Sequence, residues 1–130
     1  MEYRFVIGVE PKTKKNSQQI IKVKGRPMII PSKQYREYQQ ACGANLPQIA
    51  TINKPVNVKA IYYMKTKRRV DLTNLHEALH DILVHYKILE DDNSKIIVST
   101  DGSRVKYDKE NPRTAVTITV LQEGEYDQIV

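Results

Sequence analysis

Residues 68–92 constrain the fold of this chain more than any other segment, because they set a helical apolar pattern between two groups of acids. Apolar side chains recur there with the 3.6-residue period of a helix: Leu72, Leu75, Leu79, Ile82, Leu83 and Tyr86. This spacing predicts a central helix over residues 72–86 with one face buried in a core. Asp71 directly precedes that helix, and Asp91 and Asp92 follow it after a short apolar return.

The rest of the chain predicts one α+β domain over residues 1–130, a mixed β-sheet packed with two main helices. Ser32 is a good N-cap for a first helix that reaches residue 44. Residues 24–27, K-G-R-P, predict a hairpin turn. Alternating or β-branched runs predict strands at residues 3–9, 18–23, 28–30, 56–64, 96–99, 104–107 and 114–121. We expect a loop at residues 45–55 and a frayed tail from residue 122.

The chain is basic, with a net charge of +6, and its cations are grouped. One group lies in an N-terminal loop and another directly precedes the first acid: Lys12, Lys14 and Lys15, then Lys67, Arg68 and Arg69. Lysine and arginine attract phosphate, whereas carboxylate oxygens are the ligands that Mg²⁺ prefers. Acids at two element ends of a basic protein therefore indicate divalent-metal chemistry on a polyanion, whose backbone these cations contact. As an alternative, Asp71 serves only as a cap at the positive end of the helix dipole.

Other features of the sequence exclude several classes of protein. No apolar run approaches the roughly 18 residues of a membrane helix. The N-terminus reads as a strand with an early acid, which is not a secretion signal. Cys42, the single cysteine, excludes an internal disulfide, fits a reducing cytoplasm and favours a packing role within the first helix.

Residues 76–80 read H-E-A-L-H and match the H-E-x-x-H pattern, in which two histidines bind zinc and the glutamate activates water. The metzincin continuation places a glycine and a histidine where this chain has Leu83 and Tyr86. A zinc peptidase is therefore the weakest of our functional hypotheses. The structural interpretation is that the histidines are solvated side chains beside the apolar stripe.

Three groups of residues together resemble the RusA family of Holliday junction resolvases: D-L-T-N-L at 71–75, then Ala78, Asp81 and Leu83, then E-D-D at 90–92. P-x-x-x-K-N at 11–16 and S-x-D-G-S-R-V at 99–105 are similar to further family segments. The family consists of small, largely phage- and prophage-borne endonucleases. The resemblance implies a homodimer that uses Mg²⁺ to cut a four-way DNA junction symmetrically.

The resemblance also implies roles for individual residues. Asp71 matches the first acid of the family motif D-x-D-N, Asp92 matches its last acid, and Asp91 matches the acid beside it. Thr73 departs from the second acidic position, and Glu77 stands where the best-known members place a catalytic lysine. Because these two positions are about one helical turn apart, we predict that Glu77 supplies the missing carboxylate. The open alternative is that Glu77 is an ordinary exposed glutamate.

The favoured hypothesis is a Mg²⁺-dependent endodeoxyribonuclease, with Mn²⁺ as a substitute metal, that resolves branched DNA in recombination and repair. The metal is expected between Asp71 and Asp92, with Glu77 or Asp91 completing its ligands and a bound water activated by the ion. The second hypothesis is a non-catalytic junction-binding protein on the same scaffold. Binding without cleavage under any divalent metal would distinguish the second hypothesis from the first.

Overall fold

The structure, a computed structural model, describes residues 1–14 and 18–122. Its centre is a five-stranded mixed sheet. The strands are β1 (Glu2–Ile7), β7 (Arg113–Val120), β4 (Val56–Met64), β5 (Ile97–Ser99) and β6 (Arg104–Tyr107). β7 pairs antiparallel with both β1 and β4, whereas β5 and β6 lie in succession along the other edge of β4 and run parallel to it. The predicted α+β class and mixed sheet are confirmed.

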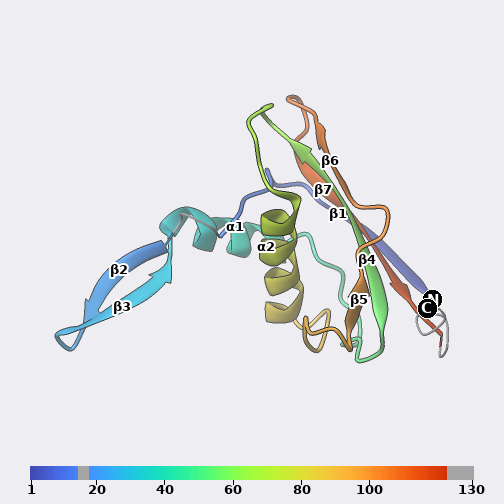
Figure 1. Cartoon of the computed structure of the whole chain (residues 1–130), viewed down its shortest axis with the longest axis horizontal. Coiled ribbons are helices and arrows are strands. Elements are labelled where there is room, and N and C mark those ends of the chain that lie inside the picture. Colours follow the sequence, from blue (N-terminus) through green and yellow to red (C-terminus); the bar gives the residue numbers. More distant parts are fainter. Residues whose placement is uncertain (15–17, 123–130) are drawn as a thin grey trace.

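Both helices, α1 (Lys33–Gly43) and α2 (Leu72–His85), lie on the same side of this sheet, and within the described residues its opposite face carries no helix (Figure 1). The predicted N-cap of α1 is confirmed, because the Ser32 hydroxyl accepts a hydrogen bond from the Tyr35 backbone N–H at 3.1 Å. That bond satisfies one of the donors that a helix start leaves unpaired.

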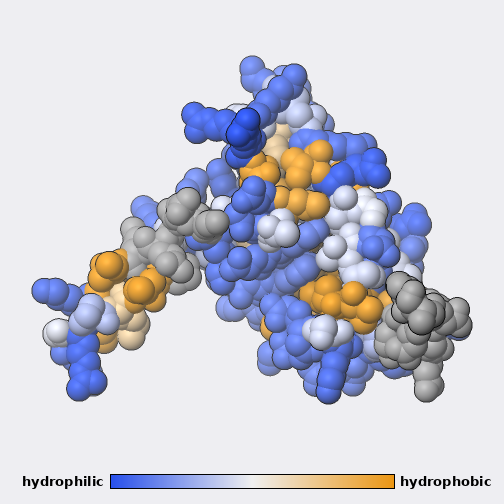
Figure 2. Space-filling view, viewed as in Figure 1, coloured by the Kyte–Doolittle hydropathy of each residue, from blue (hydrophilic) through white to orange (hydrophobic). Residues whose placement is uncertain are grey.

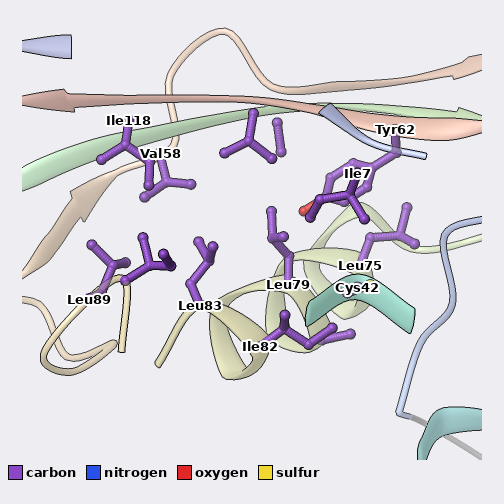
Figure 3. Close-up of a cluster of buried hydrophobic side chains, with 14 of the residues drawn as sticks. Ile7, Cys42, Val58, Tyr62, Leu75, Leu79, Ile82, Leu83, Leu89 and Ile118 are labelled. Atoms are coloured by element: carbon purple, nitrogen blue, oxygen red, sulfur yellow. The ribbon is translucent and has the colours of Figure 1, made fainter. Parts of the chain in front are cut away.

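The hydrophobic core fills the space between the sheet and the helices (Figure 3). Alternate residues of β4 face the helices and are buried: Val56, Val58, Ala60 and Tyr62. The apolar stripe of α2 meets them, as its period predicts. Cys42 of α1 is fully buried in the same core, and burial raises the pKa of its thiol to about 11. Its packing role is therefore confirmed.

A separate two-stranded hairpin, β2 (Gln18–Val23) and β3 (Arg26–Pro31), projects away from this body (Figure 1). Its turn consists of Lys24 and Gly25 at φ 53° and 79°, as a two-residue turn matched to strand twist requires. The turn is thus shorter than the predicted residues 24–27. The apolar side chains of this arm are exposed, with Ile20 at 74% and Ile29 at 66% (Figure 2).

Element boundaries agree with the sequence expectations within one or two residues. α2 begins at the predicted residue and ends one residue early, with Tyr86 as its C-cap. β1 ends at Ile7 rather than at residue 9, because the Gly8 N–H leaves the sheet and donates to Asn45 Oδ1 at 3.1 Å. Most of the predicted tail, residues 123–130, lies outside the described residues. Within the described ranges, no helix is long and apolar enough to span a membrane.

Candidate functional site

Asp71 stands at the N-terminal end of α2 as its N-cap residue, with extended backbone angles. Its carbonyl accepts hydrogen bonds from the backbone N–H groups of Asn74 and Leu75, both at 3.1 Å. Its carboxylate makes no capping hydrogen bond to the helix backbone, and instead Oδ2 accepts one from Asn74 Nδ2 at 3.3 Å. The side chain is exposed. The backbone of Asp71 thus starts the helix, while its carboxylate remains open to solvent.

The second acidic group follows α2 in a tight turn. Asp91 Oδ1 accepts a hydrogen bond from the Asp92 backbone N–H at 2.7 Å, and its Oδ2 accepts one from Asn93 Nδ2 at 3.1 Å. Asn93 in turn accepts one from the Lys95 backbone N–H at 2.9 Å. Both aspartates are exposed. The Asp91 carboxylate is therefore oriented by its own turn, and Asp92 lies beside it at the surface.

These two acidic groups lie at opposite ends of α2 (Figure 1). A helix of 14 residues is about 21 Å long. Hydrogen bonds confirm the separation, because Glu90 N–H donates to Ile52 O at 3.0 Å, next to the start of β4, whereas Asp71 follows the end of that strand. Mg²⁺ binds oxygen at roughly 2 Å, so one ion does not contact Asp71 and Asp92 of the same chain. The described residues contain no group of three His, Cys, Asp or Glu side chains placed to hold a metal.

Thr73 and Glu77 lie on one exposed face of α2, a helical turn apart as expected. Burial is the largest influence that raises the pKa of Tyr35 on α1, followed by the hydrogen bond to Asp81, and the charge of Glu77 adds a smaller one. Glu77 is the sixth of the 14 residues of α2, so it lies closer along the helix to Asp71 than to Asp92.

Asp81, one turn beyond Glu77, organises a cluster that sequence analysis did not assign. Its Oδ2 accepts a hydrogen bond from the Tyr35 hydroxyl at 2.9 Å, and its Oδ1 lies 3.6 Å from Lys14 Nζ. Lys14 also lies 5.6 Å from the centre of the Tyr35 ring. The cluster ties the N-terminal basic loop to both helices. Two features of the sequence indicated Asp81, its place in the family motif and its four-residue spacing from Thr73 and Glu77, and neither indicates Tyr35 or Lys14 as its partners.

Of the predicted DNA-contacting residues, Lys12 and Arg68 lie near the start of α2, whereas Lys14 contacts Asp81 in the C-terminal half of that helix. Lys12 pairs with Glu10 at 3.3 Å, whereas Arg68 and Arg69 are exposed. Lys12 and Arg68 line one open cavity of about 420 Å³, together with Val70, the residue before Asp71. The cavity brings the two predicted basic segments together beside Asp71. Lys15 lies outside the described residues.

Lys67, between these segments and the sheet, is held over an aromatic ring. Its Nζ lies 5.0 Å from the centre of the Tyr107 ring on β6. A cation over an aromatic face is stabilised by the ring quadrupole. Lys67 therefore connects the loop before α2 to the edge strand of the main sheet.

The two histidines of H-E-A-L-H do not lie in solvent, so that expectation is wrong. His76 is only 9% exposed, and its Nδ1 shares a hydrogen bond of 2.8 Å with the Tyr62 hydroxyl. The His80 ring stacks on it, with ring centres 5.3 Å apart and planes 8° from parallel. Burial, and then the charge of His76, lowers the pKa of His80 to about 4. Both residues extend the apolar stripe as neutral packing groups.

The S-x-D-G-S-R-V segment at 99–105 forms the turn that connects β5 and β6 along one edge of β4. Asn57 Oδ1 accepts hydrogen bonds from the Ser99 hydroxyl at 2.5 Å and from the Asp101 backbone N–H at 2.8 Å. Gly102 adopts φ 87°, which favours glycine, and Ser103 accepts a bond from the Ala60 backbone N–H at 2.9 Å. This segment therefore positions two strands against β4.

A small basic α+β domain with arginines beside a helix-end aspartate has the features of a protein that acts on nucleic acids. The family model for endodeoxyribonuclease RusA matches residues 9–119, so the chain belongs to the RusA family. That family comprises Holliday junction resolvases, endonucleases that act on branched DNA. No curated protein matches the chain.

Proposed function

We propose that this chain is a divalent-metal-dependent endodeoxyribonuclease that resolves four-way DNA junctions during recombination and repair. Membership of the RusA family supports cleavage of branched DNA. The net charge of +6 supports a polyanionic substrate. The cations nearest to Asp71 give such a substrate a place to bind beside that carboxylate.

The observation that carries the proposal is the separation of Asp71 from Asp91 and Asp92 by the length of α2, about 21 Å for its 14 residues. One chain therefore offers two half-sites, and in the described residues neither places three carboxylates where they could hold one metal ion. In a symmetric dimer each surface contact occurs twice. If the α2 helices of two copies run antiparallel past one another, Asp71 of one copy approaches Asp92 of the partner subunit. The same contact then recurs on the other side of the axis.

This arrangement gives two identical carboxylate sites per dimer, as paired cuts in opposed strands require. Glu77 belongs to the Asp71 half of each site, because both lie toward the N-terminal end of α2. Carboxylates suit Mg²⁺, and Mn²⁺ is the natural substitute in a site of oxygen ligands. The ligand set within one chain does not fit such an ion, so we assign metal binding to the dimer alone.

The test is a synthetic four-way junction incubated with the protein in EDTA, in Mg²⁺ and in Mn²⁺, and scored separately for binding and for nicking. We expect binding in all three conditions and symmetric nicks only with metal. Cleavage in EDTA, or failure to bind the junction, would contradict the proposal. A peptidase would show neither property and would contain stoichiometric zinc.

One observation favours a second candidate function, a junction-binding protein without catalysis. Thr73 stands at the position that the family motif fills with an acid, which leaves fewer carboxylates near Asp71. This function predicts that the junction is bound and never cut, whichever divalent ion is supplied. It also predicts that Thr73→Asp, which restores the motif, gains cleavage that the wild-type chain lacks.

A further inference from the structure

The face of the main sheet that carries no helix has an uneven distribution of charge. Strand register brings Arg113, Tyr63 and Lys106 into one row across β7, β4 and β6, and places Arg104 in the next row. All four side chains lie on the face opposite the buried residues of β4, since neighbours in a row share a face. Lys59 lies on the same face, in the row after that of Arg104. Basic residues thus spread over the sheet from the end of β4 that leads to Asp71.

Two acids at this face pair with arginine. Glu2 pairs with Arg4 at 2.8 Å, and Asp108 pairs with Arg113 at 2.9 Å. The hydrogen bond from Arg113 holds the pKa of Asp108 below its usual range. Among the described residues, no acid lies within ion-pair distance of Lys59, Arg104 or Lys106. A net positive surface therefore remains around Tyr63.

The contacts of Tyr63 decide which form of DNA this surface fits. Arg113 Cζ lies 3.7 Å from the centre of its ring, and Lys106 Nζ lies 6.0 Å from it. A ring occupied by two cations does not offer its face to an unpaired base, the contact on which binding of single strands depends. The ring holds the cations in place instead. Positioned cations on a broad sheet suit the phosphate backbone of a duplex.

This surface is continuous with the predicted basic residues next to Asp71. Lys67 stands over Tyr107, and Lys106, the residue before Tyr107, points to the opposite face of the sheet. The basic residues therefore continue from Arg68 and Arg69 around the β6 edge onto the helix-free face.

From this geometry we propose that the helix-free face around Tyr63 binds a duplex arm of branched DNA beyond the cleavage site. The inference rests on the proposed nuclease function, and it adds a second contact surface to the one beside Asp71. A junction presents several arms at once, so a protein that binds with two surfaces prefers it to a linear duplex. The contacts are made to phosphates and carry no sequence preference.

The test measures binding to a four-way junction and to a linear duplex in EDTA over a range of salt concentrations. Arg104→Gln with Lys106→Gln removes two exposed cations from the face. Each lost phosphate contact lowers the salt slope by about 0.9, so we expect the junction slope to fall by about 2. We expect the preference for the junction over the duplex to fall with it. The matched control, Lys33→Gln with Lys54→Gln, removes two exposed cations elsewhere and should leave both quantities unchanged.

An unchanged slope in the first variant, or an equal loss in the control, would overturn the inference and leave the nuclease proposal standing. A change in oligomeric mass with no change in slope would also overturn it, because the face would then bind a second copy. If the wild-type protein does not bind the junction, the nuclease proposal falls first.

Crosslinking supplies an independent readout. Cys42 is fully buried, so a benzophenone maleimide reacts with an introduced surface cysteine. Lys106→Cys should crosslink to an arm of the junction, and Lys54→Cys should not. Equal or absent crosslinking from Lys106→Cys would contradict the inference.

Discussion

The two ends of α2 both carry acids, but they differ in what surrounds those acids. At the N-terminal end, the Asp71 carboxylate accepts a hydrogen bond from the Asn74 side chain at 3.3 Å, and the preceding residue, Val70, lines a cavity together with Lys12 and Arg68. At the C-terminal end, Asp91 is oriented by two hydrogen bonds within its own turn. The first end thus combines a carboxylate with cations for phosphate, whereas the second presents a preordered acidic turn. The N-terminal end supplies the cations, and the C-terminal end supplies the oriented carboxylates. For this reason we propose that the site is shared between two chains.

The largest expected effect comes from removing one acid at either end. Asp71→Asn and Asp92→Asn should each lower nicking of a four-way junction about a hundredfold or more, because a lost metal ligand costs several kcal/mol in the transition state. Binding should persist or strengthen, since repulsion of phosphate is reduced. Near wild-type cleavage by one variant would remove that end from the site. Circular dichroism supplies the control, because both side chains are exposed and the fold should not change.

Glu77 tests how far the N-terminal half-site extends along α2. Glu77→Gln should lower cleavage as much as Asp71→Asn if Glu77 replaces the acid missing at Thr73. The matched control is Glu37→Gln, an exposed glutamate on α1, which should cleave normally. When Thr73→Asp is added to Glu77→Gln, the double variant should cleave as well as Glu77→Gln alone or better. Normal cleavage by Glu77→Gln would show that Glu77 is an ordinary surface residue.

α2 separates the two acidic ends as a fixed spacer, and the half-buried His80 tests how firmly this helix is held. Its pKa in the folded state, about 4, lies below the ordinary value of 6.5, so protonation favours unfolding. The contribution of neutral His80 to the free energy of unfolding is fully present above pH 6.5, and it is lost as the pH falls toward 4. Urea unfolding should show that the wild type loses roughly 2–3 kcal/mol more than His80→Gln between pH 7 and pH 4.5. Parallel pH profiles of the two proteins would contradict this account of the helix.

The smallest effect concerns the cations of the two predicted basic segments. Arg68→Ala with Arg69→Ala should lower the salt slope of junction binding by about 2 and leave cleavage of bound DNA largely intact. Lys12→Ala with Lys14→Ala should lower the slope less, because acids pair with these lysines at 3.3 and 3.6 Å. Equal slopes for the two variants would indicate that the intramolecular pairs open when DNA binds.

The sequence predicted the fold well where local periodicity dominates. β4 has the predicted bounds, α2 starts at the predicted residue, and Ser32 caps α1. The burial of His76 was missed because its partner, Tyr62, lies on another element. A histidine at the border of an apolar stripe gives no signal of such a partner. The cluster of Asp81, Tyr35 and Lys14 was missed for the same reason.

For the candidate site, the sequence predicts individual residues and not their arrangement. The family motif groups Asp71, Asp91 and Asp92 as candidate ligands, and nothing in the motif gives the distance between them. Helix length did contain that information, because 14 residues at 1.5 Å each separate the two groups by about 21 Å. Whether the chain completes the site with a second copy depends on surfaces that only the folded protein presents.

The measurement that tests the shared site most directly is complementation between two inactive variants. Asp71→Asn and Asp92→Asn are purified separately, mixed under conditions that exchange subunits, and assayed on a four-way junction with Mg²⁺. In a mixed dimer, one site combines both substitutions, and the other combines Asp71 of one chain with Asp92 of its partner. We predict that the mixture regains cleavage and makes single nicks. Mass spectrometry that shows mixed dimers without any return of activity would contradict the shared site.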